Sequence, residues 1–443
     1  MKIQKLSTDS YKGVRDFYPE DMRVQNYIFN TWRKTLQSFG YEEYAASILE
    51  PSELYEAKTG EEIINEQTYS FIDRGDRKVT LRPEMTPTVA RMVAGRRHEL
   101  AFPLRLFSIP NLFRYERPQK GRLREHFQLN ADIFGDSTRC AEIEMIQIAS
   151  ALMKNFGIKE YDFEIRISSR RLINAVMSEW YELDEEGSKK LMKLIDRKGK
   201  MSEEDFTTKA REISGDAFQF FSFDPMSEVY EEAMALLPIR VAKEELDGII
   251  NDLKSRGISN VIFDSELIRG FDYYTGTIFE VFDKHKENNR ALFGGGRYDE
   301  LLSLFGGDNV PAVGFGMGDV TIYDALTTYN LIPDSVKQSV IDVSLLCIDE
   351  NAIVHAEKVA DELREKNVNV ALNTSLKKIG DQIKHAEKTG ITYIIAIGEN
   401  EIKSGEYTLK NIVTGDETKG TLPQVCKSVT IDSHEKDRLR YRN

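Results

Sequence analysis

Cysteine is scarce in this sequence: Cys140, Cys347 and Cys426 are the three among 443 residues, and they lie far apart. They form no CxxC pair and no Cys/His ligand spacing, so we expect no disulfide framework, no structural zinc and no metal site built from protein side chains. No apolar run approaches the roughly twenty residues that cross a bilayer, and the first residues, MKIQKLSTDSYKG, lack the apolar core of a signal peptide. These absences predict a cytoplasmic protein.

Basic residues are outnumbered by acidic ones, 60 against 73, which gives a formal net charge of -13. This balance argues against a protein that coats nucleic acid non-specifically, but it allows a specific RNA partner held by local basic patches. Hydrophobic residues make up 41% and charged residues 30% of the chain, as in an ordinary globular protein. The length predicts about two to three domains.

The stretch from Phe113 to Gly135, FRYERPQKGRLREHFQLNADIFG, predicts two strands joined by a basic loop. On the second strand, polar and apolar residues alternate: His126, Gln128, Asn130 and Asp132 with Phe127, Leu129, Ala131 and Ile133. Successive strand side chains point to opposite faces, so we expect one apolar face and one row of hydrogen-bonding groups. Gln128 and Asp132, four residues apart on one face, can therefore reach the same pocket.

The loop between these strands, RPQKGRLR (117–124), holds four basic residues and no acid. Basic charge concentrated against an acidic background fits a polyanion partner such as phosphate or nucleic acid. A solvated hairpin tip explains the loop equally well.

Hydrophobic periodicity, with capping and turn residues, predicts the other helices and strands of the N-terminal two thirds of the chain. We expect helices over Glu20–Phe39 and Cys140–Phe156, and strands over Tyr41–Ile48 (broken by Pro51), Gln67–Asp73, Lys78–Arg82, Tyr161–Ser168 and Asn260–Asp264. Residues 170–256 are rich in Glu, Lys and Met with helical periodicity, and they predict a helical insertion to which we assign no chemistry.

In LRPEMTP, Thr86 can cap a helix that has Pro87 at its first position. Glu84 would then lie between a strand and a helix N-terminus. A carboxylate there can hold the ammonium group of a ligand, or it can simply complement the helix dipole.

A second informative stretch is LIRGFDYYTGTIFEVF (267–282), an aromatic strand preceded by Arg269. An arginine on an apolar sheet pairs with a buried acid at least as often as it binds a substrate. Tyr273 and Tyr274 face opposite sides of a regular strand, so only one of them can line a given pocket unless the strand bulges. A core role for the pair is the common alternative.

Two glycine clusters follow, Gly294-Gly295-Gly296 before a short helix and Gly314, Gly316 and Gly318 along a strand. Backbone without side chains lets a ligand approach closely, and the alternating set offers a smooth face to a flat purine ring. A flexible turn for the first cluster and close strand-on-helix packing for the second are the competing explanations.

Beyond a linker, the pattern alternates strand, helix, strand, helix and strand from Val340 to Ile397, with a hairpin over Glu406–Val413. This alternation predicts a separate α/β domain with parallel strands. Its second helix carries Lys377, Lys378 and Lys384, which form either a solvated face or a second RNA contact.

Four of these stretches, in this order, resemble the signature motifs of the histidyl-tRNA synthetases, a family of class II aminoacyl-tRNA synthetases. LRPEMT and FRYERPQKGR resemble motifs partly shared across the class, IRGFDYYTGTIFE resembles the histidine-specific signature, and GGGRYD with PAVGFGMG resembles the second histidine signature and the start of class motif 3. SLKKIGDQIKHAEKTG resembles the anticodon-binding domain of the family. The resemblance covers nearly the whole chain.

The resemblance implies an α+β catalytic domain with an antiparallel sheet flanked by helices, interrupted by a helical insertion and followed by an α/β anticodon-binding domain. We expect the catalytic domain at 1–169 and 257–326, the insertion at 170–256, the linker at 327–339 and the C-terminal domain at 340–443. It also implies ATP-dependent formation of histidyl-adenylate and transfer of the histidyl group to tRNA-His. Magnesium is expected with ATP, and a homodimer is expected with its interface around Pro51.

The family motifs also assign roles residue by residue. Arg114 and Arg269 match the catalytic arginines, which suit bidentate contacts to phosphate and carboxylate oxygens. The other matching positions are, for histidine, Glu84, Thr86, Gln128, Asp132, Tyr273 and Tyr274; for ATP, Arg114, Arg122, Gly316 and Gly318; and for the tRNA acceptor end, Arg117 and Gln119.

Two positions depart from the family pattern. Asp132 stands where the family often has the longer Glu, and Val320 and Thr321 stand where motif 3 normally has Glu and the arginine that contacts the γ-phosphate. Another cation is then expected to hold that phosphate. Two other functions remain open: a histidine-sensing regulatory subunit of ATP phosphoribosyltransferase, which is a synthetase paralogue without tRNA charging, and activation of a different amino acid.

Overall fold

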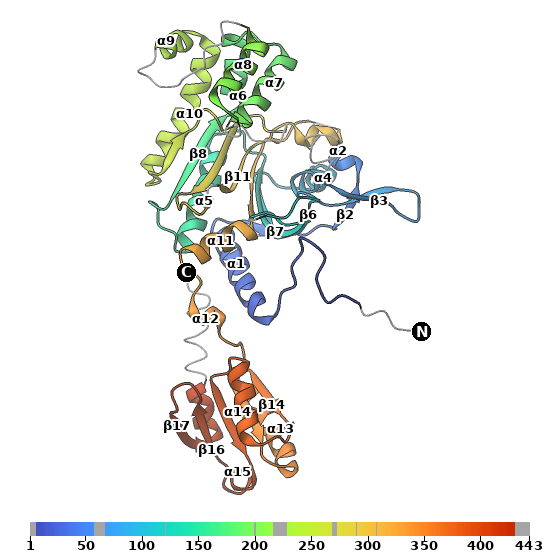
Figure 1. Ribbon diagram of the computed structural model, residues 1–443, viewed down its shortest axis with the longest axis vertical. Coiled ribbons are helices and arrows are strands. Elements are labelled where there is room, and N and C mark those ends of the chain that lie inside the picture. Colours follow the sequence, from blue (N-terminus) through green and yellow to red (C-terminus); the bar gives the residue numbers. More distant parts are fainter. Residues whose placement is uncertain are drawn as a thin grey trace. The chain divides into compact units, whose positions relative to one another are not determined.

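The computed structural model describes residues 6–56, 67–119, 121–198, 201–215, 228–267, 273–288, 290–306 and 308–429. Within it the chain forms two compact units, residues 1–16 with 31–331 and residues 17–30 with 332–443. Helix α1 (Pro19–Ser38), predicted over Glu20–Phe39, contributes to both. Figure 1 shows the helices and strands of both units.

A nine-stranded mixed sheet organises the first unit in the part of the chain that is described. Its strands, in spatial order, are β1 (Glu42–Glu43), β5 (Leu104–Ser108), β7 (Glu125–Phe134), β12 (Ala312–Gly318), β11 (Ala291–Arg297), β10 (Thr277–Asp283), β8 (Phe163–Ser169) and β9 (Val261–Phe263), with β6 (Asn111–Phe113) paired to β7. The central pairs are antiparallel, as predicted, whereas β1–β5 and β8–β9 at the two edges are parallel.

Helix α5 (Cys140–Asn155) packs against the centre of this sheet through β10 and β12. Most of its residues are buried, which fits its predominantly apolar sequence. Helix α11 (Asp319–Thr328) begins directly where β12 ends and packs on β7, β11 and β12. The strands that bear the predicted site residues are therefore fixed in the middle of the unit.

A separate three-stranded sheet, β2 (Leu49–Pro51), β4 (Lys78–Leu81) and β3 (Tyr69–Ile72), contains the predicted hairpin. A strand does end at Pro51, as predicted, but that strand is β2, in which Pro51 is the last residue and pairs with Val79. β2 is an edge strand, where a missing backbone N–H costs no ladder hydrogen bond. Of the residues predicted to form a strand over Tyr41–Ile48, only Glu42 and Glu43, which make up β1, do so.

The stretch predicted to be helical is confirmed as such where it is described. It contains α6 (Arg170–Ala175), a π-helical turn (Val176–Trp180), α7 (Glu185–Asp196), α8 (Glu203–Ser214), α9 (Glu228–Ala235) and α10 (Leu237–Ser255), which Figure 1 shows grouped beside β8. Asp184 and Ser202 begin α7 and α8 by accepting hydrogen bonds from backbone N–H groups of the first turn. No helix in the described residues is long and apolar enough to span a membrane.

The C-terminal part of the second unit is the predicted α/β domain. Its elements are β13 (Val343–Cys347), α13 (Glu350–Arg364), β14 (Val370–Asn373), α14 (Ile379–Lys388), β15 (Tyr393–Ile397), α15 (Glu399–Ser404), β16 (Glu406–Asn411) and β17 (Glu417–Thr421). β13 pairs in parallel with β14 and β15, as the alternation predicted. The predicted hairpin is longer than expected, because its return strand is β17.

Candidate active site

A small pocket of about 110 Å³ lies over β11 and β12. Its lining residues are Glu84, Thr86, Arg114, Gln128, Tyr273, Tyr274, Gly294, Tyr298, Gly314, Phe315 and Gly316. Five of the six residues predicted to bind histidine thus come together from three separate stretches of the chain. The sixth, Asp132, contacts the lining residue Tyr298 through a short hydrogen bond.

Glu84 lies between β4 and α4 (Thr86–Arg96), as predicted, and is buried. Its carboxylate accepts a hydrogen bond of 3.2 Å from the hydroxyl of Tyr273. The prediction that Thr86 caps the helix is wrong, because Met85 occupies the N-cap and no side chain caps there. Thr86 is instead the first helical residue, and it lines the pocket.

Asp132 is almost completely buried, with 3% of its surface exposed, and the hydroxyl of Tyr298 donates to its Oδ1. Burial raises the pKa of the Asp132 carboxyl to about 7, although the hydrogen bond from Tyr298 acts in the opposite direction. A buried carboxyl group with a raised pKa therefore lies behind Tyr298, which lines the pocket.

The alternating glycines of β12 make room for side chains from the neighbouring strand. Gly314 pairs with Asp132 of β7, and a Cβ at Gly314 would collide with the Asp132 carboxylate. A Cβ at Gly316 would lie 2.8 Å from the side chain of Gln128. Strand-on-helix packing is thus not the reason for glycine at these two positions. A purine-binding role for Gly316 and Gly318 stays a prediction.

Gly294, Gly295 and Gly296 lie inside β11, so the explanation of a flexible turn is wrong. A Cβ at any of them would collide with a backbone carbonyl of β10 or β12. Glycine there allows these strands to pair closely while Gly294 opens onto the pocket.

Tyr273 and Tyr274 both line the small pocket, contrary to the expectation for a regular strand. They precede β10, which begins at Thr277, so the alternation rule does not apply to them. Their ring centroids are 4.9 Å apart. The two rings therefore pack against each other while both line the pocket.

A larger cavity of about 200 Å³ shares Arg114, Gln128 and Gly316 with the small pocket. Its other lining residues are Glu116, Gly121, Arg122, Leu123, His126, Ala291, Leu292, Phe293, Gly318, Val320 and Thr321. The two adjoining spaces fit a pair of substrates that react at their common border, where Arg114 lies.

Arg114 follows β6, and hydrogen bonds from its backbone and its side chain hold it in place. Its backbone N–H donates to the carbonyl of Arg124 at 2.9 Å, and its Nε donates to the carbonyl of Pro83 at 2.8 Å.

His126 also lines this cavity. Its burial, with Arg114 and Arg15 nearby, lowers the pKa of His126 to about 3. His126 is therefore neutral at pH 7, and the cations lining this cavity in the described residues are Arg114 and Arg122.

Arg122 and the predicted tRNA contacts lie on the loop before β7. Gln119 and Arg122 bond to each other through their backbones around Gly121, which has a φ of 76°. Arg117 and Gln119 are exposed and line neither cavity, whereas Arg122 reaches from the loop into the larger one and contacts Glu116 at 3.4 Å. The loop thus forms part of the wall of the larger cavity and also exposes side chains to solvent, and its contact with tRNA stays a prediction.

Arg269, the second predicted catalytic arginine, lies outside the described residues. Val320 and Thr321 do line the larger cavity, so the departure from motif 3 falls at the site itself. The Thr321 hydroxyl donates to the carbonyl of Leu292 at 2.8 Å, which ties α11 to β11.

Sequence reasoning missed Tyr298 and Glu116. Tyr298 lies in the GGGRYD stretch, of which only the glycines were assigned a role, and Glu116 directly precedes the basic loop. A tyrosine two residues beyond Gly296 projects to the same side of an extended chain, and this spacing was the available signal.

Residues 13–320 match the family model described as Histidyl-tRNA synthetase, and residues 342–430 match the one described as Anticodon binding domain. The chain belongs to the histidyl-tRNA synthetase family. The resemblance proposed from the motifs is thus confirmed.

Curated members of this family are similar to the chain over nearly their full length. The histidine–tRNA ligase of Leptospira biflexa is 42% identical over 420 residues, covering 94% of this chain and 95% of the relative. That of Thermoplasma volcanium is 35% identical over 428 residues, covering 95% of this chain and 97% of the relative.

Solved structures share the fold. The histidyl-tRNA synthetase of Nostoc sp. has a TM-score of 0.76 at 21% identity, covering 96% of this chain and 100% of that chain. A Bacillus halodurans protein described as an ATP phosphoribosyltransferase regulatory subunit/histidyl-tRNA synthetase has a TM-score of 0.66 at 24% identity, covering 86% and 97%. The predicted architecture, a class II catalytic domain with an α/β anticodon-binding domain, is confirmed.

Proposed function

We propose that this chain is a histidine–tRNA ligase that activates L-histidine with ATP and transfers the histidyl group to the 3′ end of tRNA-His. The observation that carries the proposal is the junction of two cavities at Arg114, Gln128 and Gly316. One cavity is small, polar and aromatic, and the other is lined by arginines and glycines. An amino acid and a nucleotide bound in them would meet at the Arg114 guanidinium.

The residues suggest how the first step is accelerated. Attack of the histidine carboxylate on the α-phosphate increases negative charge around phosphorus, so the site needs fixed cations rather than a covalent nucleophile. Arg114, held by Pro83, suits that role, and Arg122 lies further along the larger cavity. We assign Arg122 to the outer phosphates of ATP, where motif 3 offers Val320 and Thr321 instead of an arginine.

The small pocket supplies matched polar groups for histidine. We assign Glu84 and Gln128 to the α-amino group. We assign Tyr274 to the imidazole ring, together with Asp132, which contacts the lining residue Tyr298. A buried polar group left unpaired by the wrong side chain costs about 1–3 kcal/mol, which supports discrimination among amino acids.

We expect magnesium to accompany ATP. The described residues contain no cluster of three or more His, Cys, Asp or Glu side chains that could hold a metal. Mg²⁺ in nucleotide sites is commonly held by the phosphates with one or two carboxylates, and Glu116 in the larger cavity fits that need. Magnesium would supply charge neutralisation on the phosphates.

Histidine-dependent ATP–pyrophosphate exchange tests the proposal, followed by charging of tRNA-His. We expect exchange with histidine and not with other amino acids. A regulatory subunit of ATP phosphoribosyltransferase is the second candidate, favoured by Val320 and Thr321 in place of the motif 3 pair. It would bind histidine without exchange, and that result would remove the ligase proposal.

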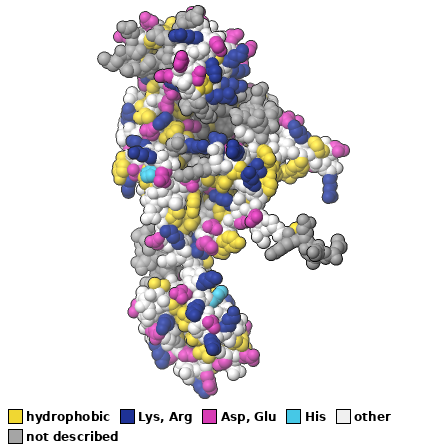
Figure 2. Space-filling model, in the orientation of Figure 1, with side chains coloured by type: hydrophobic (Ala, Val, Ile, Leu, Met, Phe, Trp, Pro, Cys, Tyr) yellow, Lys and Arg dark blue, Asp and Glu magenta, His cyan; other side chains and the backbone are white. Residues whose placement is uncertain are grey.

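We also propose that the chain forms a homodimer through the β2–β4–β3 sheet. The strand register places Leu49, Pro51, Tyr69, Phe71, Val79 and Leu81 on one face of this sheet. Leu49 and Phe71 are 45% and 48% exposed, and Figure 2 shows hydrophobic side chains along this projecting part of the molecule. Exposed apolar faces of this kind mark association sites.

Phe71→Glu is expected to convert the dimer to a monomer, because it places a charge in the apolar face. Sedimentation or light scattering measures the change. Ile72→Glu is the matched control. Ile72 is 61% exposed, but it directly follows Phe71 on the strand, so its side chain points to the opposite face of the sheet. A dimer that survives Phe71→Glu would place the interface elsewhere.

A further inference from the structure

We propose that Arg297, through its ion pair with Glu142, is a positioning residue that sets the affinity for histidine by holding Tyr298 against Asp132. The inference rests on the proposed function of the small pocket and adds residues outside it. Arg297 and Glu142 are buried behind the sheet, on the side of α5, and neither lines the small pocket.

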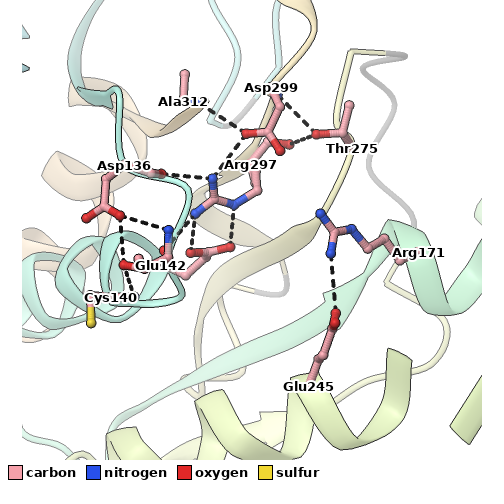
Figure 3. A network of polar contacts seen from close by, with 10 residues as sticks. Asp136, Cys140, Glu142, Arg171, Glu245, Thr275, Arg297, Asp299 and Ala312 are labelled. Atoms are coloured by element: carbon pink, nitrogen blue, oxygen red, sulfur yellow. Dashed lines mark hydrogen bonds and ion pairs between the residues drawn. The ribbon is translucent and has the colours of Figure 1, made fainter. Parts of the chain in front are cut away.

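The guanidinium of Arg297 has all five of its N–H groups bonded (Figure 3). Nε and Nη2 form a bidentate pair with Glu142, each at 2.6 Å. The remaining three donors bond to the carbonyls of Asp136 and Thr138 and to Oδ1 of Asp299, at 3.0 to 3.1 Å. Such a planar fork fixes both distance and direction, which a lysine cannot do.

This network anchors both partners of the Tyr298–Asp132 hydrogen bond. Arg297 directly precedes Tyr298 in the chain. The carbonyls of Asp136 and Thr138 belong to the segment that follows β7, the strand that carries Asp132. One guanidinium therefore ties the end of β11 to the end of β7.

The residue after Tyr298 is fixed as well. Asp299 accepts a hydrogen bond from the Ala312 N–H at 3.2 Å, and its own N–H donates to Thr275 Oγ1 at 3.0 Å. Tyr298 itself donates its N–H to the carbonyl of Ala312 at 2.8 Å. With both neighbours held, the Tyr298 ring has little freedom, and it is 1% exposed.

A cavity of about 270 Å³ lies behind the sheet, and Arg297 and Glu142 form part of its wall. Arg171 and Glu245 line the same cavity and contact each other at 3.4 Å, away from the Arg297 network (Figure 3). Small ions can reach Arg297 from this cavity. It also provides a control, because Arg171 has no bond to the segments that carry Tyr298 and Asp132 among those the structure records.

Arg297→Ala with rescue by guanidinium ion tests the proposal. We expect the KM for histidine in pyrophosphate exchange to rise about 10- to 100-fold while the KM for ATP stays nearly constant, because a displaced positioning group costs up to about a hundredfold. Millimolar guanidinium should enter the cavity, pair with Glu142 and lower the KM for histidine again. Arg171→Ala should change neither constant.

The double variant Arg297→Ala/Glu142→Gln should not respond to guanidinium, since the carboxylate that would hold the ion is gone. An unchanged KM for histidine in Arg297→Ala, or equal rises for histidine and ATP without rescue, would overturn the proposal. If Arg297→Ala does not fold, Glu142→Gln carries the same test, because it keeps the side-chain volume and removes the charge. Absence of exchange in the unaltered protein would instead refute the proposed function.

Discussion

Asp132→Asn is expected to remove most histidine activation and, at alkaline pH, to stabilise the fold. The pKa of the buried Asp132 carboxyl is about 7, against an ordinary value of 3.8. The folded protein therefore binds a proton that the unfolded chain has already lost over this interval. Its stability falls as pH rises from about 4 to 7, because a charge must be buried.

The size of this contribution follows from the shift. About three pKa units correspond to roughly 4 kcal/mol at and above pH 7, as an upper figure, and to almost nothing below about pH 4. Asparagine keeps the shape and still accepts the hydrogen bond from Tyr298, but it cannot ionise. The advantage of the variant in free energy of unfolding should thus grow by a few kcal/mol between pH 4 and pH 8.

Urea denaturation at a series of pH values measures this difference. Asp132→Glu is the matched control, because it retains an ionisable carboxyl and should retain pH-dependent stability. For activity, Asp132→Asn should lower kcat/KM for histidine about a hundredfold, since the imidazole loses a charged acceptor. A stability advantage of Asp132→Asn that does not change with pH would show that the pKa of Asp132 is not raised in the folded protein.

Arg114→Gln is expected to lower the kcat of pyrophosphate exchange by about 10² to 10³. Loss of one fixed group that stabilises developing charge in a transition state has effects of that size. Glutamine keeps part of the side-chain length and polarity, so the loss should be in the chemical step rather than in folding. We expect the KM for histidine to change less than kcat, so both constants are to be measured.

Arg96→Gln serves as the control for Arg114→Gln. Arg96 lies at the end of α4, is largely exposed and pairs with Glu99 on the surface, where ion pairs contribute little. Its substitution should leave exchange unaffected. Equal losses in both variants, or a nearly unchanged kcat in Arg114→Gln, would contradict the role assigned to Arg114.

Local sequence patterns predicted some of the residues at the pocket. The alternation along β7 placed Gln128 and Asp132 on one face, and it did so correctly because the two-residue period of a strand does not depend on its partners. Local patterns failed where the pairing of strands decides where a strand begins and ends. The strand that ends at Pro51 is β2, which pairs with β4, and not the one predicted over Tyr41–Ile48. Both Tyr273 and Tyr274 reach the pocket because β10 begins only at Thr277.

The sequence by itself determined the family, many of the helices and strands, and the residue types that the site would contain. All of these depend on short-range periodicity and on motifs within single stretches. The tertiary structure alone decided that Tyr298 bonds to Asp132, that Asp132 titrates near neutrality and that Arg297 meets Glu142, 155 residues away. These features depend on burial and on contacts between distant strands, which no local pattern of residues encodes.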